Sequence, residues 1–133
     1  MHTALSSRSR YLSGEFVISI VDDDLWVREA IASYLRSRSY PVAAFASAEE
    51  FLQSDELDRT TCVVIDIQLP GLSGIDLQRE LRAIGRTTPV IFITALADED
   101  VRNRAMAAGA VAFLRKPFEA AAFDRCLDSA LGG

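Results

Sequence analysis

Residues 62–74 read CVVIDIQLPGLSG, a continuous apolar run that ends at Asp66 and is followed by a turn containing Pro and Gly. An unbroken run of Val and Ile predicts a strand that is buried on both faces, as in parallel sheets. Two similar runs and two shorter ones lie on either side of it. They are Phe16–Val21 and Val90–Ile93, and the shorter Val42–Phe45 and Val111–Leu114.

Helical patterns separate these strands. Apolar residues recur at spacings of three and four, which is typical of helices with one buried face. These patterns lie around residues 27–35, 47–52, 77–84, 98–108 and 123–131. Segment 98–108 offers mainly alanines to the interior, so we expect it to be weakly held. The alternation predicts an α/β fold: a flavodoxin-like, doubly wound sheet of five parallel strands in the order 2-1-3-4-5, with helices on both faces.

The composition indicates one globular domain. The 133 residues carry a net charge of −5, which disfavours nonspecific binding of nucleic acid by the chain itself. Residues 1–14 are predicted to form a flexible N-terminal tail, and residues 15–133 are predicted to form the domain. No run is long enough to span a membrane and the N-terminus lacks a signal-peptide pattern, so we expect a cytoplasmic protein with no membrane contact. Cys62 and Cys126 are predicted to be buried free thiols.

Polar side chains follow four of the five predicted strands. Asp22, Asp23 and Asp24 follow the first, Asp66 the third and Thr94 the fourth, while the fifth leads to Lys116, the only lysine among fourteen basic residues. The carboxyl ends of parallel strands lie at one edge of a sheet, which is where ligands bind in such folds. The sequence therefore predicts a site at this edge. Asp24 is predicted to cap the first helix, and Trp26 to be half-buried at its start.

The residue types in this site suit phosphoryl chemistry with a divalent cation. Carboxylate oxygens are the ligands that Mg²⁺ prefers, with water and a phosphate completing its shell. A carboxylate can also attack phosphorus and form an aspartyl phosphate. Lys116 and the Thr94 hydroxyl would then bind the phosphoryl oxygens.

The chain resembles the receiver domains of bacterial two-component response regulators, most closely those attached to helix-turn-helix transcriptional regulators. The similarity extends from about Phe16 to Leu131, with the motifs in the family's order. The matching stretches are IVDD (20–23), VIDIQLPGLSG (64–74), PVIFITA (89–95), AGA (108–110) and KPF (116–118).

The resemblance implies a role for each site residue. Asp66 would be the phosphoacceptor, and Asp23, Asp66 and the backbone carbonyl of Gln68 would ligate Mg²⁺, with Asp22 acting through a water molecule. Lys116 would contact the phosphoryl group. Thr94 and the aromatic Phe113 would be the switch residues, and the Lys116–Pro117 peptide would be cis.

The implied function is a phosphoryl-accepting signalling switch. A sensor histidine kinase would be the partner that phosphorylates Asp66, and the change would alter the surface of the fourth helix, fifth strand and fifth helix. The chemistry would be limited to self-phosphorylation and slow autodephosphorylation, so the chain would not be an enzyme in the ordinary sense. Phosphorylation could produce a homodimer, and DNA would be reached only through an output domain absent from this chain.

Two alternatives remain open at this point. The first is a phosphatase resembling the haloacid dehalogenase superfamily, with Asp22 as nucleophile and Asp24 as acid. Leu25-Trp26 after this pair, and the lack of an acidic pair on a strand after Lys116, count against it. The second is a receiver-like interaction module that is not phosphorylated, although no acidic, Thr or Lys position is lost. Single Asp-to-Asn substitutions would separate these readings.

Overall fold

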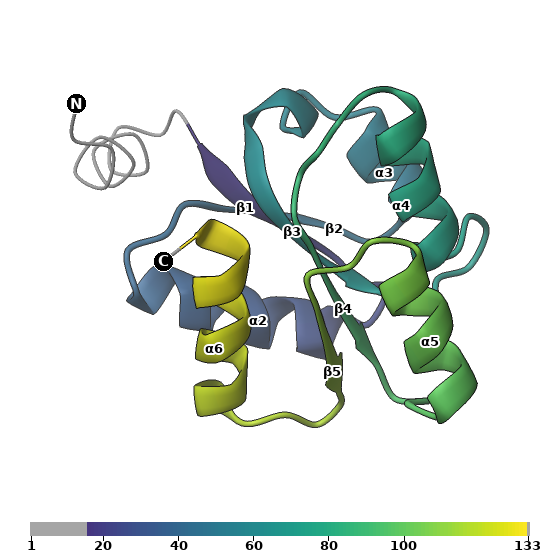
Figure 1. The fold of residues 1–133 in the computed structure, drawn as a ribbon. Helices are drawn as coiled ribbons and strands as arrows, with labels where there is room; N and C mark the ends of the chain where they lie inside the picture. The colour runs from purple at the N-terminus through teal and green to yellow at the C-terminus, as the bar shows by residue number, and fades with distance from the viewer. Residues whose placement is uncertain (1–15, 133) are drawn as a thin grey trace.

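The computed structural model describes residues 16–132, so the predicted tail, residues 1–14, lies outside the described part. Five parallel strands form one sheet in the order β2-β1-β3-β4-β5, which confirms the predicted fold (Figure 1). The strands are β1 (Val17–Val21), β2 (Val42–Phe45), β3 (Thr60–Asp66), β4 (Val90–Thr94) and β5 (Ala112–Arg115).

Helices cover both faces of the sheet, as predicted (Figure 1). One face packs against α2 (Leu25–Ser37) and α6 (Ala120–Leu131). The other packs against α3 (Ala48–Leu52), α4 (Gly74–Ala83) and α5 (Glu99–Ala107). A short 3₁₀ turn, Leu57–Arg59, precedes β3.

Strand alternation divides the core into two layers. Cys62 and Val64 of β3 point to the α2–α6 face, while Val63 and Ile65 point to the α3–α4–α5 face. All four are completely buried, which explains why the sequence shows a continuous apolar run rather than an alternating one. Burial of each large side chain contributes about 1.5–3 kcal/mol, so this central strand anchors the site at its carboxyl end.

The helix starts are specified by short polar side chains. The Asp24 carboxylate accepts hydrogen bonds from the Trp26 and Val27 N–H groups, which confirms its predicted capping role. Ser47, Ser73 and Asp98 cap α3, α4 and α5 in the same way. These caps fix where each helix begins after a strand, and so fix the loops that surround the strand ends.

Several local details differ from the sequence-based predictions. β3 begins two residues earlier than predicted, and β5 is shifted by one residue.

The two cysteines differ in burial. Cys62 is buried, and burial raises the pKa of its thiol to about 12, as expected for an inert structural cysteine. Cys126 is only partly buried, since it lies at the edge of the apolar face of α6. Within residues 16–132, no helix has both the length and the apolar character needed to cross a bilayer.

Candidate functional site

The carboxyl ends of β1 and β3 bring three carboxylates together. Oxygen atoms of Asp22, Asp23 and Asp66 lie within 4.8 Å of one another, although Asp66 is distant in sequence from the other two. Asp22 and Asp66 are buried and Asp23 is exposed, so the cluster opens to solvent on one side. The predicted acidic site is therefore present in the geometry of the fold.

Lys116 joins the cluster from the loop after β5. Its Nζ atom lies 2.9 Å from Asp22 Oδ2 and 3.0 Å from Asp66 Oδ2, so one ammonium bridges two carboxylates. Its backbone N–H donates to the Thr94 carbonyl at 2.8 Å, which ties this loop to the end of β4. The Lys116–Pro117 peptide is cis, as predicted.

The two buried carboxylates make similar hydrogen bonds but differ in their access to solvent. Asp22 Oδ1 accepts the Asp24 N–H at 2.9 Å, and its side chain is completely inaccessible to solvent. Asp66 Oδ1 accepts the Gln68 N–H at 2.9 Å, but 7% of its side chain remains accessible. Asp66 is thus held in a fixed orientation while keeping a path to solvent.

The donor set fits a divalent cation of the magnesium type. Three carboxylates face one ammonium, so negative charge is in excess within the cluster. All the side-chain donors are hard oxygen atoms, and one exposed carboxylate leaves room for coordinated water. Asp22, Asp23 and Asp66 are the residues that could hold such an ion.

A protein-family model for the response regulator receiver domain matches residues 18–127. The chain belongs to this family. The resemblance of the chain to receiver domains is therefore confirmed, and with it the expected role of the domain in signalling.

Relatives of known name agree with this assignment. Nodulation protein W of Bradyrhizobium diazoefficiens is 43% identical over 117 residues, which cover 88% of this chain and 48% of the relative. Transcriptional regulatory protein FixJ of Azorhizobium caulinodans is 40% identical over 116 residues, covering 86% and 54%. The solved structure of FixJ-N matches with a TM-score of 0.79 at 33% identity, covering 88% of this chain and 94% of that one. The receiver thus spans about half the length of these curated relatives.

The family description is that of the receiver domain of response regulators, and FixJ of Azorhizobium caulinodans is named as a transcriptional regulatory protein. Membership supports a phosphoryl-accepting signalling domain rather than an enzyme in the usual sense. Receiver domains generally use Mg²⁺ at an acidic pocket, and the carboxylate cluster described above matches that requirement.

Burial and pairing oppose each other at the receiver's charged groups. Burial raises the pKa of Asp66, with hydrogen bonds from the Gln68 N–H and Lys116 acting in the other direction. Burial also disfavours the charge of Lys116, but the hydrogen bonds and charges of Asp22 and Asp66 outweigh it, so the pKa of Lys116 is raised. Lys116 is therefore a cation at neutral pH.

The two predicted switch residues lie on β4 and β5. Thr94 is completely buried, and its hydroxyl oxygen accepts the Leu96 N–H at 3.1 Å. Phe113 is partly buried against the core of the α3–α4–α5 face. Among the described residues, the hydrogen-bond partner of the Thr94 hydroxyl is the Leu96 N–H and not a carboxylate of the site.

Some features of the site were not predicted from the sequence. Trp26 is 83% exposed rather than half-buried, because the side of α2 that packs against the sheet begins at Val27 and continues through Ile31 and Leu35. Arg28 Nη1 donates to the Asp22 backbone carbonyl at 2.7 Å, and so helps to fix the β1–α2 loop. Nothing in the sequence distinguishes Arg28 from the other helical arginines.

Gly74 is required by close packing behind Asp66. A Cβ atom at this position would lie 2.4 Å from the Asp66 carbonyl oxygen and 2.8 Å from Ile67 Cα. Because both neighbours are backbone atoms, Gly74→Ala is expected to lower the free energy of unfolding by about 3 kcal/mol, measured by chemical denaturation.

Gly85→Ala is the matched control for this prediction. Its φ of +84° makes alanine unfavourable, but no atom lies within 4 Å of the added Cβ. We therefore expect a smaller loss, about 1 kcal/mol, from backbone strain alone. Equal losses for the two variants would show that packing against Asp66 is not the cause.

Proposed function

We propose that this receiver accepts a phosphoryl group on Asp66 in a reaction that needs Mg²⁺. The supporting observation is the bridging position of Lys116, whose ammonium lies 3.0 Å from Asp66 and 2.9 Å from Asp22 within the acidic cluster. Such a cation can stabilise charge that develops on the transferring phosphoryl oxygens.

In the proposed step, an Asp66 carboxylate oxygen attacks the phosphorus atom. A new O–P bond forms while the P–N bond of a kinase phosphohistidine breaks, and the imidazole leaves as the neutral base after taking up a proton. With acetyl phosphate as donor, a P–O bond breaks instead and acetate leaves. Asp23, Asp66 and the Gln68 carbonyl would hold Mg²⁺, with Asp22 acting through water, and the ion would neutralise charge on the phosphoryl group.

Asp66 is a better nucleophile candidate than Asp22. Both carboxylates accept a backbone N–H on Oδ1 and lie next to Lys116 through Oδ2, but the Asp22 side chain is completely inaccessible to solvent whereas 7% of the Asp66 side chain is accessible. Asp24, which a dehalogenase-like phosphatase would need as its acid, is occupied by capping α2. These contacts argue against the phosphatase alternative, and the retained Lys116 and Thr94 argue against a module that is not phosphorylated.

The physiological phosphodonor is proposed to be a sensor histidine kinase. An apolar groove of about 540 Å³ runs between α2 and α6 and reaches the site at Lys116 and Ala95. A donor protein must cover this end of the sheet to bring its phosphohistidine to Asp66, and the groove provides apolar area for that contact. A cytoplasmic location is the proposed setting.

The first test of this proposal is the metal dependence of labelling. The wild-type receiver is incubated with acetyl phosphate, with Mg²⁺ or with EDTA, and its intact mass is measured. We expect a gain of one phosphoryl group only when Mg²⁺ is present. A gain that persists in EDTA, or no gain in Mg²⁺ from folded protein, would contradict the proposal.

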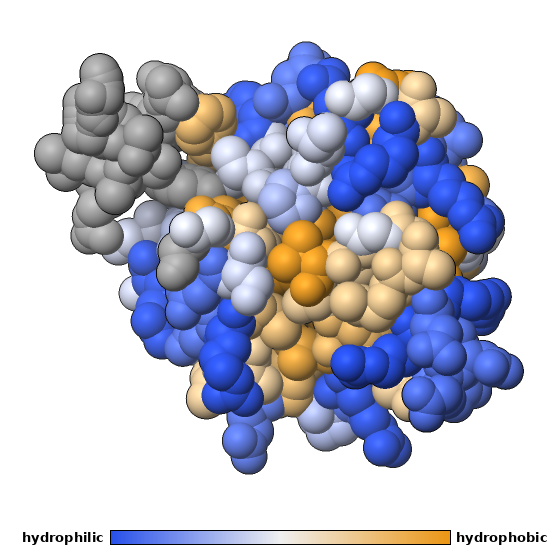
Figure 2. Space-filling view, viewed as in Figure 1, coloured by the Kyte–Doolittle hydropathy of each residue, from blue (hydrophilic) through white to orange (hydrophobic). Residues whose placement is uncertain are grey.

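Phosphorylation is further proposed to produce a homodimer through the α5–β5–α6 face. Figure 2 shows an apolar strip between α5 and α6, bordered by hydrophilic side chains. Met106 is 41% exposed and Val111 38% exposed, which leaves large apolar side chains uncovered in this part of the chain. After phosphorylation, two copies of the receiver would pair along this strip.

Beryllofluoride with Mg²⁺ is expected to raise the sedimentation coefficient of the wild-type receiver. Met106→Glu places a charge on an exposed apolar position of α5 and should keep the protein monomeric while leaving beryllofluoride binding intact. An unchanged sedimentation coefficient for activated wild type would contradict the dimer, and an equal increase in both proteins would contradict pairing through this face.

A further inference from the structure

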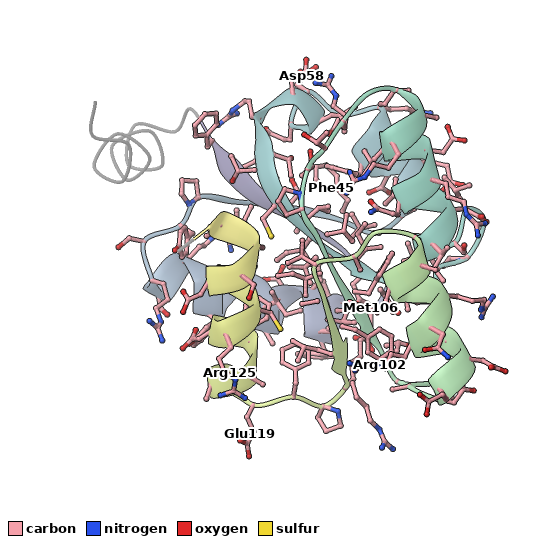
Figure 3. All side chains as sticks on the ribbon, in the orientation of Figure 1. Phe45, Asp58, Arg102, Met106, Glu119 and Arg125 are labelled. Carbon is pink, nitrogen blue, oxygen red and sulfur yellow. The ribbon has the colours of Figure 1, made fainter. Side chains whose placement is uncertain are left out.

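Arg102 of α5 lies over the aromatic ring of Phe113 on β5. The guanidinium carbon is 5.9 Å from the ring centroid, within the range of a cation–π contact. Figure 3 labels Arg102 where α5 faces β5. The contact therefore links α5 to Phe113, the aromatic residue of β5 for which the family resemblance implies a switch role.

Strand register places Phe113 close to Thr94. Phe113 pairs with Phe92 of β4, and Thr94 lies two residues further along the same strand. Residues two apart on a strand point to the same face, so Thr94 and Phe113 both face the α3–α4–α5 side. In this structure the Thr94 hydroxyl is occupied by the Leu96 N–H, and the Phe113 ring is only partly buried beneath Arg102.

Few other contacts hold α5 in place. Among its described residues only Ala105 is buried, and Val101 is partly buried against the core. An alanine buries little apolar area, so a contact between Arg102 and Phe113 is a substantial part of what joins α5 to β5. Loss of this one contact should affect the position of the ring more than the stability of the domain.

We propose that Arg102 is a positioning residue that holds Phe113 in the partly buried orientation of this structure and so opposes activation. The inference rests on the proposed function, phosphorylation of Asp66, together with the movement of Thr94 and Phe113 that the resemblance to receiver domains implies for these switch residues. An inward movement of the ring would break the contact with the guanidinium. Arg102 therefore stabilises the resting state relative to the activated state, which sets how readily the receiver switches.

The test is the affinity of the receiver for beryllofluoride in the presence of Mg²⁺, measured by calorimetry. Arg102→Gln should bind about 2–5-fold more tightly than wild type, because the resting state loses a cation–π contact. Arg104→Gln removes the same charge from an exposed position of α5 and is the matched control. Arg102→Lys, which keeps a cation, should fall between wild type and Arg102→Gln.

A double-mutant cycle ties the effect to the ring. In a Phe113→Leu background, Arg102→Gln should leave the affinity unchanged. Equal shifts for Arg102→Gln and Arg104→Gln, no shift for Arg102→Gln, or a shift that persists without the ring would each overturn the inference. Failure of folded wild type to bind beryllofluoride would instead overturn the proposed function on which it rests.

Discussion

Asp66→Asn is expected to abolish phosphorylation by acetyl phosphate completely. The amide is a far weaker nucleophile than the carboxylate, so no acyl phosphate can form at this position. The substitution nearly conserves shape, and the amide oxygen can still accept the Gln68 N–H that now binds Asp66 Oδ1. Intact mass after incubation with Mg²⁺ should therefore equal that of the untreated variant, while its thermal unfolding remains cooperative.

Asp22→Asn provides the comparison. It removes a charge from the same cluster, but under the proposed function it leaves the acceptor in place. We expect labelling that is slower than in wild type yet still detectable. The opposite pattern, with labelling retained in Asp66→Asn and lost in Asp22→Asn, would favour the phosphatase alternative.

Lys116→Met is expected to have the second-largest effect. Removal of the ammonium takes away the cation proposed to stabilise the phosphoryl oxygens, so the labelling rate should fall by about 10²-fold or more. It also leaves Asp22 and Asp66 without the counter-charge at 2.9 and 3.0 Å. Because Lys116 is 17% exposed rather than fully buried, we expect a loss of about 1–3 kcal/mol in the free energy of unfolding.

Mg²⁺ should restore part of that stability, because it supplies positive charge to the same carboxylates. Thermal unfolding with and without Mg²⁺ checks this, with the neighbouring exposed Arg115→Met as control. The difference between the two metal conditions should be larger for Lys116→Met than for wild type. A Lys116→Met protein that is as stable and as rapidly labelled as Arg115→Met would contradict the assigned role.

The fold could be predicted because its three central strands, β1, β3 and β4, are buried on both faces. A run such as CVVI in β3 has no polar position, and this pattern distinguishes a central parallel strand from a surface strand. The convergence of Asp22, Asp66 and Lys116 then follows from topology alone, since all three lie at the carboxyl ends of adjacent or nearby parallel strands. The apolar pattern is weaker in the edge strand β5, because this strand is only partly buried.

Other features depend on side-chain directions that the sequence does not determine. Trp26 lies on a side of α2 that does not pack against the sheet, and an apolar residue at a helix start does not reveal this. The contact of Arg102 with Phe113 depends on the packing angle of α5 against β5, and one exposed arginine resembles another in sequence. Contacts between individual side chains of different elements therefore require the structure, whereas the location of the site can be predicted from the strand order alone.

The most direct test of the account is chemical trapping of the acceptor. Wild-type receiver phosphorylated by acetyl phosphate in Mg²⁺ is treated with borohydride, which reduces an aspartyl phosphate to homoserine, and the site is located by peptide mass spectrometry. The account predicts homoserine at position 66 and unmodified aspartate at positions 22, 23 and 24. Homoserine at position 22, or a phosphorylated protein in which no aspartate is reduced, would contradict it.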